Sequence, residues 1–285
     1  MTKFIYIADS HVGAGETGYY QQPRYADRLP ELAALLDAWI QQDGDIDFVL
    51  HGGDMVDAAS VDNIRVARAM FQLSVPVYLC LGNHDLTGEN ALDLWLAEAP
   101  VFFPEQAPAF AVRSADCFVH VVPVQWCDTP YFWSEEQRPH FLPEHLDRVR
   151  AVVADNPDVA HILCVHADVF GIPQEQTGFD DVYHPPLKAY TQTVLDFVRR
   201  HPQICCVLSA HNHINSCVVR DGVPFVTGSA FAETPFEFKV IEVGTGDVTM
   251  TTYDLLPDVL FKALYNYDKT FVQGRKKDRA FVVRE

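Results

Sequence analysis

Five times along this chain, a short apolar run stops at residues that can bind a metal ion. The runs are rich in β-branched and aromatic residues, which is typical of buried strands. The polar stretches that follow them are Asp9-Ser10-His11, His51 to Asp57, Gly82 to Asp85, His166, and Ser209 to His213. Ligands of open α/β sheets bind at the carboxyl ends of the strands, so the pattern predicts an α/β fold with Asp, His and Asn at one edge.

A scatter of structural polar residues is the alternative explanation for these stretches. Taken singly, an Asp-x-His or His-x-His carries little information, because most histidines at strand ends are solvated or held by a hydrogen bond. Five such stretches in this order, each behind an apolar run, favour a metal site instead. Carboxylate, imidazole and amide groups without thiolates suit divalent Mn, Fe, Zn or Co.

These five stretches resemble the motifs DxH, GDxxD, GNH(D/E), H and GHxH of the calcineurin-like metallophosphoesterase superfamily. The resemblance runs from residue 4 to about residue 250, and one departure is Ala210 in place of the last motif's glycine. Together with helical periodicity over 25–42, 60–74, 89–97, 144–154 and 187–200, it implies two facing mixed β-sheets flanked by helices. This four-layer α/β/β/α sandwich is expected to occupy residues 1–254, with residues 255–285 as a C-terminal extension.

The resemblance also implies a pair of divalent metal ions and a hydroxide bridging them that attacks a phosphoester. One ion would be held by Asp9, His11 and His213, the other by Asn83, His166 and His211, with Asp54 between them. His84 would contact a phosphoryl oxygen or protonate the leaving group. Asp57 or Asp85 would orient neighbouring groups.

The form of two motifs narrows the expected reaction. GNHD, together with Asp57-Ala58-Ala59 where Ser/Thr protein phosphatases carry Arg-Gly, resembles bacterial class III cyclic-nucleotide phosphodiesterases and their glycerophosphodiesterase relatives. The sequence therefore predicts a phosphodiesterase acting on a small phosphodiester. A phosphomonoesterase, a nuclease of the same superfamily and a non-catalytic metal-binding scaffold stay open as alternatives.

Composition limits the partners and the compartment. The formal net charge of −18 argues against a nucleic-acid partner, since such binding uses clustered Lys and Arg. No apolar stretch approaches the ~20 residues that a membrane span needs, and no signal peptide is recognisable at Met1. Seven cysteines without a CxxC motif are typical of small core residues in a reduced compartment. We therefore expect a soluble, cytoplasmic protein.

Three loops and the tail are expected to decide the substrate. The loops span residues 12–24, 125–143 and 167–186; the second is dense in aromatic residues, and the third has the length of a lid. His184 in the third loop is a candidate for substrate contact. The other histidines outside the motifs are expected to be core or surface residues. The tail could pack back on the domain, cover the pocket mouth or form a homodimer contact.

Overall fold

Two six-stranded β-sheets form the centre of the protein in the computed structural model, which describes residues 1–15, 17–244 and 246–284. The strands of the first sheet are, in order across it, β12 (Ala280–Arg284), β11 (Asp247–Asp254), β10 (Glu237–Gly244), β1 (Thr2–Ile7), β2 (Phe48–His51) and β3 (Val77–Leu79). Those of the second are β4 (Phe110–Arg113), β5 (Cys117–Val121), β6 (Ala160–Cys164), β7 (Ile204–Ser209), β9 (Val223–Thr227) and β8 (Ser216–Arg220).

Both sheets are mixed, as the sequence predicts. In the first, β1, β2 and β3 are parallel, while β10, β11 and β12 pair antiparallel. In the second, β5, β6, β7 and β9 are parallel and the edge strands β4 and β8 are antiparallel. Parallel strands end at the same edge of a sheet, which brings the residues after β1, β2, β3, β6 and β7 together.

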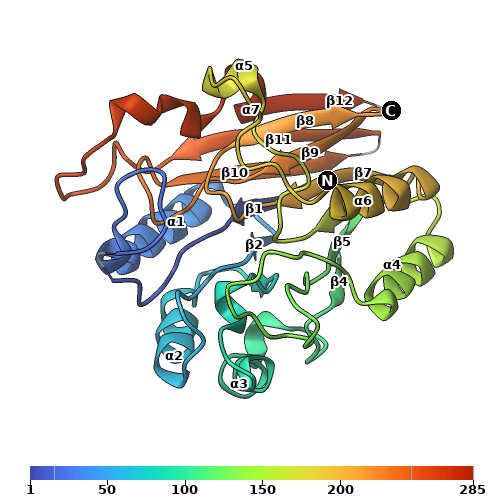
Figure 1. The fold of residues 1–285 in the computed structure, drawn as a ribbon, viewed down its shortest axis with the longest axis horizontal. Coiled ribbons are helices and arrows are strands. Elements are labelled where there is room, and N and C mark those ends of the chain that lie inside the picture. The colour runs from blue at the N-terminus through green and yellow to red at the C-terminus, as the bar shows by residue number, and fades with distance from the viewer. Residues whose placement is uncertain (16, 245, 285) are drawn as a thin grey trace.

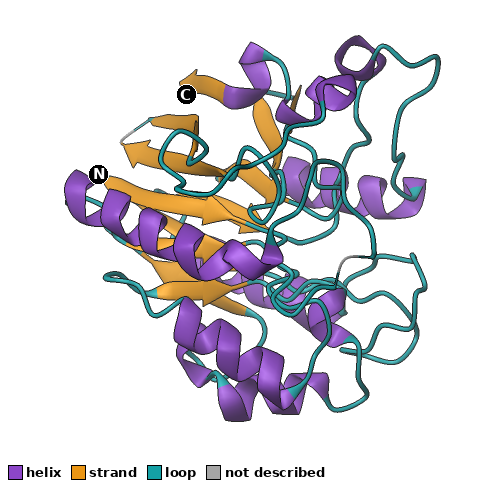
Figure 2. Ribbon diagram, turned by 90° about the vertical axis from the view of Figure 1, so that its left-hand side faces the viewer, coloured by secondary structure: helices purple, strands orange, loops and turns teal. Residues whose placement is uncertain are grey.

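Helices flank the two sheets. They are α1 (Leu29–Asp43), α2 (Val61–Met70), α3 (Ala91–Glu98), α4 (Pro143–Asp155), α5 (Gln174–Thr177), α6 (Lys188–Arg200) and α7 (Lys276–Arg279), with 3₁₀ turns η1 (Ala26–Arg28), η2 (His84–Leu86), η3 (Pro100–Phe102) and η4 (Tyr267–Gln273). Figures 1 and 2 show α1 and α2 on one side of the sheets, and Figure 1 shows α4 and α6 on the other. The α/β sandwich expected from the sequence is therefore confirmed.

The periodicity of α1 shows why these segments are helical. Its buried residues Leu29, Leu32, Leu36 and Ile40 recur every three or four positions and form one apolar face. The helix ends at Gly44, whose φ of 78° is left-handed and whose N–H donates to the Ile40 carbonyl. Glycine adopts this conformation without strain, so it terminates the helix.

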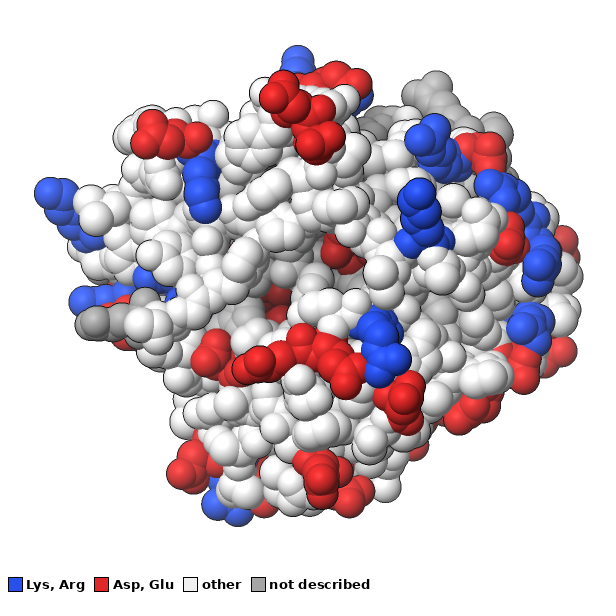
Figure 3. Space-filling model, in the orientation of Figure 1, with Lys and Arg blue, Asp and Glu red and all other residues white. Residues whose placement is uncertain are grey.

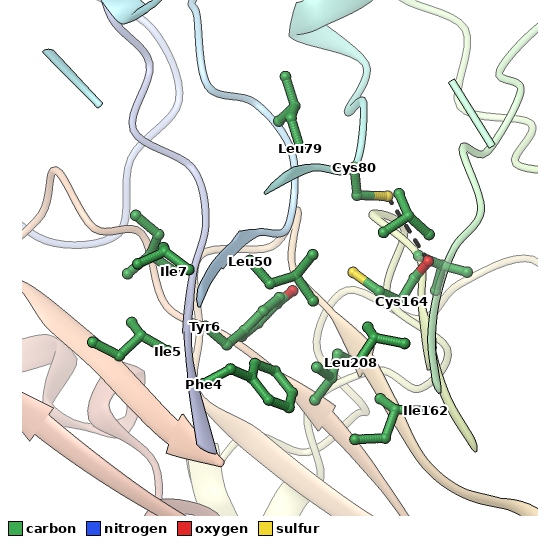
Figure 4. Packing of buried hydrophobic residues seen from close by; sticks show 14 of the residues in the cluster. Phe4, Ile5, Tyr6, Ile7, Leu50, Leu79, Cys80, Ile162, Cys164 and Leu208 are labelled. Atoms are coloured by element: carbon green, nitrogen blue, oxygen red, sulfur yellow. Dashed lines mark hydrogen bonds between the residues drawn. The ribbon is translucent and has the colours of Figure 1, made fainter. Parts of the chain in front are cut away.

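The core lies between the two sheets. Along β1, side chains alternate between the faces: Figure 4 shows Phe4 and Tyr6 directed toward Leu208 of β7, with Ile5 on the opposite side. The Tyr6 hydroxyl donates to the Ser209 carbonyl at 2.8 Å, which ties the ends of β1 and β7 together. Residues that follow these two strands are therefore held at a constant separation.

The C-terminal extension is built into the same body. Strand β12 pairs with β11, and Val272 packs in a small buried cluster with Ile172 and Ile214. The Asp278 carboxylate accepts the Cys217 N–H at 3.0 Å, which attaches α7 to β8. A homodimer contact through the tail stays a prediction. Among the described residues, no helix has the length and apolar character needed to cross a membrane.

Candidate metal centre

The expected metal ligands lie in the turns directly after the strands, and most of them have strained backbones. Asp9, His11, Asp54, His211 and His213 all have φ between 47° and 74°. This left-handed region is uncommon for residues other than glycine, and such strain clusters at functional sites. The surrounding structure thus imposes these conformations and aims the side chains at one place.

Three groups of potential ligands form there among the described residues. Asp9, His11 and His213 offer atoms within 4.8 Å of one another, as do Asp54, His166 and His211, and as do His11, Asp57 and His84. The first two groups are adjacent, because Asp54 Oδ2 lies 3.2 Å from His166 Nε2 and 3.9 Å from His11 Nε2. The Asn83 amide oxygen is 2.9 Å from His211 Nδ1. All seven expected ligands therefore lie at one site.

The chemistry of these groups fits a bound cation. Both carboxylate oxygens of Asp9, the Nε2 of His166 and the Nδ1 of His11 are buried without a hydrogen-bond partner among the described residues. Buried polar atoms in folded proteins are nearly always paired, and a bound ion is one of the standard explanations for the exceptions. Carboxylate and imidazole are ligands that divalent transition metals accept.

Charge is concentrated around Asp54. Burial alone would lower the pKa of His166, but the neighbouring Asp54 carboxylate raises that pKa to about 10. Burial lowers the pKa of His211 to about 3. A divalent cation that binds beside Asp54 would therefore compete with a proton for the Nε2 of His166.

Groups behind the ligands fix their orientation. His166 donates from Nδ1 to the Gly52 carbonyl at 2.8 Å, which leaves Nε2 for a metal. His213 donates from Nδ1 to Glu233 Oε1 at 2.6 Å. Such carboxylate or carbonyl partners set the tautomer of a metal-binding histidine. Gly53 must be glycine, because a Cβ there would lie 2.3 Å from His166 Nδ1.

His84 and Asp57 lie at the wall of the cavity. His84 donates from Nδ1 to the Asp57 carbonyl at 2.7 Å, which leaves its Nε2 available to a ligand. Its backbone N–H donates to Asp54 Oδ1 at 2.8 Å, and its ring is 4.8 Å from the Trp133 ring. The Asp57 carboxylate lies 3.4 Å from His11 Nδ1. Both residues are placed to act on a substrate or on its immediate neighbours.

Asp85 has a different position from His84. Its buried carboxylate accepts the Val56 N–H at 3.0 Å and the Gly82 N–H at 2.9 Å. It does not line the cavity, so it fastens the turn after β2 to the turn after β3. Asp85 can therefore contribute to the site by holding the loops that carry Asp54 and Asn83.

Asp85→Asn is expected to lower the free energy of unfolding of the metal-free protein by about 2–4 kcal/mol, since an amide NH₂ would replace one acceptor and face a buried N–H donor. The measurement is urea denaturation. The exposed Asp158, for which the same substitution changes no contact, supplies the matched control Asp158→Asn. Equal midpoints for the two variants would contradict this role.

A cavity of about 640 Å³ opens over the ligands. Figure 3 shows one face of the molecule hollowed near its middle, with acidic side chains in the hollow and beside it. Beyond the motif residues, the lining includes Gly18, Tyr19, Arg24, Trp126, Trp133, Gln137, Pro139, Ala167, Asp168, His184, Pro185, Pro186 and Leu187. All three loops expected to shape the substrate site thus reach the cavity.

Sequence reasoning missed several of these contacts. Glu233 lies 20 residues after the last motif, and its only sequence signal is that it is the single charged residue between Gly228 and Phe236. Trp126 packs with its ring 4.8 Å from the His211 ring, and Tyr19 with its ring 5.2 Å from the His213 ring. The Tyr19 hydroxyl is also 2.8 Å from His184 Nε2, which joins the first loop to the third.

Known proteins share the fold of this chain. Solved structures with a similar fold include GAP50, the anchor in the inner membrane complex of Plasmodium (10% identity, TM-score 0.63, 93% of this chain and 88% of that chain). Another is the calcineurin-like phosphoesterase YfkN from Bacillus subtilis (15% identity, TM-score 0.54, 94% of each chain). At these identities the likeness shows the fold alone. A search of curated proteins finds no match. The family model of calcineurin-like phosphoesterases matches residues 2–229, and the chain therefore belongs to that family.

Proposed function

We propose that this protein is a metal-dependent phosphodiesterase that hydrolyses a small diester of the cyclic-nucleotide or glycerophosphodiester type. Membership of the family supports metal-dependent phosphoester hydrolysis, and the diester preference is our inference. The cavity carries that inference. Arg24 is the one Lys or Arg among the described residues that line it, and its guanidinium already donates to the Gly15 and Thr17 carbonyls.

The charge of the substrate follows from this lining. A phosphomonoester carries between one and two negative charges near neutral pH, whereas a diester carries one. The cavity offers carboxyl groups at Asp54, Asp57 and Asp168, where burial raises the pKa of Asp168 to about 7, but little free positive charge from the protein itself. Its side walls, which include Trp133, Pro139 and Leu187, can accept a second organic group. These features favour the singly charged substrate with two substituents.

Members of this family generally use a dinuclear divalent metal centre, and the residues present here suit one. We infer that Asp9, His11 and His213 hold one ion, that Asn83, His166 and His211 hold the other, and that Asp54 serves both. When bound, such a pair of ions supplies Lewis-acid activation of water and of the phosphoryl group. The metal identity among Mn, Fe, Zn and Co stays a prediction, as do the cytoplasmic location and the homodimer.

The chain's own residues then complete the site. His84, in its imidazolium form, would donate a proton from Nε2 to a phosphoryl oxygen or to the departing alkoxide, while its Nδ1–H stays hydrogen-bonded to the Asp57 carbonyl. Trp133 packs on the His84 ring and restricts its rotation. Trp126 shields the His211 side of the cavity from water. Positioning and exclusion of water strengthen the electrostatic interactions inside the cavity.

The test compares an activated aryl phosphodiester with the matching monoester, using manganese-loaded protein. We expect kcat/KM to be higher for the diester, and Asn83→Ala to reduce it by on the order of 100-fold, which corresponds to about 2.7 kcal/mol of lost transition-state stabilisation. Chelator-treated protein is the blank. Preference for the monoester would identify a phosphatase, and no metal-dependent turnover of either compound would support the non-catalytic scaffold.

A further inference from the structure

The C-terminal extension reaches the active-site loop through Gln22. The Gln22 side chain is fully buried, and its Nε2 donates to the Asn266 carbonyl at 3.1 Å and to the Lys269 carbonyl at 3.0 Å. Its Oε1 accepts the Asn266 N–H at 2.8 Å. Figure 1 shows this red part of the tail beside the blue loop that precedes α1. The whole amide of Gln22 is therefore used to attach the loop to the tail backbone.

The backbone of the same loop is attached to a partner of a metal ligand. The N–H groups of Gln21 and Gln22 donate to Glu233 Oε2 at 2.9 Å and 2.6 Å. The other oxygen of Glu233 accepts from His213 Nδ1 at 2.6 Å. Glu233 is only 2% exposed, so it has little access to water as an alternative partner. The loop and the ligand share one buried carboxylate.

A second contact reinforces the first. Lys269 Nζ donates to the Gln21 side-chain oxygen at 3.1 Å, so the tail attaches two successive residues of the loop. The same loop carries Tyr19, whose ring packs on the His213 ring and lines the cavity. Displacing the loop would thus move both a cavity wall and the carboxylate behind the ligand.

We propose that the tail segment 264–273 positions the metal ligand His213, acting through Gln22 and Glu233. The proposal rests on the metal assignment made under the proposed function. A buried carboxylate can orient an imidazole only if it is itself held, and here two backbone N–H groups hold it. Those two groups keep their place because Gln22 is tied to the tail. Gln22 and Glu233 are accordingly positioning residues.

The test uses the full chain, stripped of metal, and titrates it with Mn²⁺ by calorimetry. Gln22→Leu replaces the amide side chain with an apolar one of similar size and so removes the hydrogen bonds to Asn266 and Lys269. We expect it to weaken binding of one Mn²⁺ ion by about 10-fold, the lower end of the effect of removing a partner behind a metal ligand. Gln192→Leu is the matched control, because it makes the same substitution at an exposed residue of α6 and removes one hydrogen bond, from Gln192 Nε2 to Asp196 Oδ1, outside the loop and the tail.

A second readout needs no metal. Tyr19 and Tyr20 are about half exposed, so chymotrypsin can cut the loop after either residue when it opens. In the metal-free protein, Gln22→Leu should be cut several-fold faster than Gln192→Leu or the unchanged chain. Faster cleavage with unchanged Mn²⁺ affinity would overturn the proposal, since the tail would then brace the loop without positioning His213.

A double substitution tests the route through Glu233. In a Glu233→Ala background, Gln22→Leu should cause no further loss of Mn²⁺ affinity, whereas additive losses would overturn the route.

Lys269→Met is the second variant if Gln22→Leu does not fold, because it removes only the bond to Gln21. We expect it to lower the Mn²⁺ affinity by about 2-fold or more; no loss would overturn the proposal. If the unchanged protein binds Mn²⁺ and the variants bind it equally well, the positioning role alone is rejected. If the unchanged protein does not bind Mn²⁺ at all, the metal assignment is rejected as well.

Discussion

Asp54→Asn is expected to reduce kcat/KM for the phosphodiester by 1,000-fold or more and to lower the metal content of the protein. Asp54 lies between the two groups of ligands, with Oδ2 at 3.2 Å from His166 Nε2 and at 3.9 Å from His11 Nε2. Substitution by the isosteric amide removes the negative charge that would be shared by both cations. A loss of about 4 kcal/mol in transition-state stabilisation corresponds to about 1,000-fold in rate.

Metal content by elemental analysis and kcat/KM are measured on the same preparation. Asp158→Asn, the same chemical change at an exposed position, controls for the substitution itself. Circular dichroism establishes that the variant is folded, because Asp54 also accepts the His84 N–H. A folded variant that keeps two metal ions and turns over within about 10-fold of the unchanged chain would remove Asp54 from the centre of the site.

His84→Ala is expected to lower kcat by about 100- to 1,000-fold, the usual range for loss of a general acid, while the metal content stays unchanged. His84 lines the cavity and is not one of the seven expected ligands, although it forms a group with Asp57 and the expected ligand His11. Its Nδ1 is occupied by the Asp57 carbonyl, so the lost function is that of Nε2. Unchanged metal content distinguishes this variant from Asp54→Asn.

The leaving group separates the two roles open to His84. A nitrophenolate departs without a proton, whereas an alkoxide needs one. If His84 protonates the leaving group, His84→Ala will affect alkyl diesters much more than nitrophenyl diesters; equal losses would assign it to a phosphoryl oxygen. His140→Ala, at an exposed histidine outside the cavity, is the control. If His84→Ala turns over both substrates within about 3-fold of the unchanged chain, both roles are excluded.

Local sequence was sufficient to predict the fold class and the group of candidate ligands. Each candidate comes within a few residues of a strand, and the strands are recognisable as apolar, β-branched runs. Since parallel strands end at a common edge, position along the chain alone implied that Asp9, Asn83 and His166 would meet. The helices were also predictable from local sequence, because the apolar face of a helix such as α1 is formed by residues within 15 consecutive positions.

The supports of the site were decided only by tertiary structure. Glu233 reaches His213 from 20 residues away, and Gln22 meets Asn266 across 244 positions, with no periodicity or motif linking them. The return of β10 beside β1 and of β12 beside β11 likewise depends on long-range pairing. Asp85 shows the same limit: its place in the Gly-Asn-His-Asp motif indicated a functional residue, but only the folded chain shows its carboxylate engaged by Val56 and Gly82. The motifs contain the residues that a reaction needs. The groups that orient those residues come from distant parts of the chain and are brought to them by tertiary packing, which local sequence does not reveal.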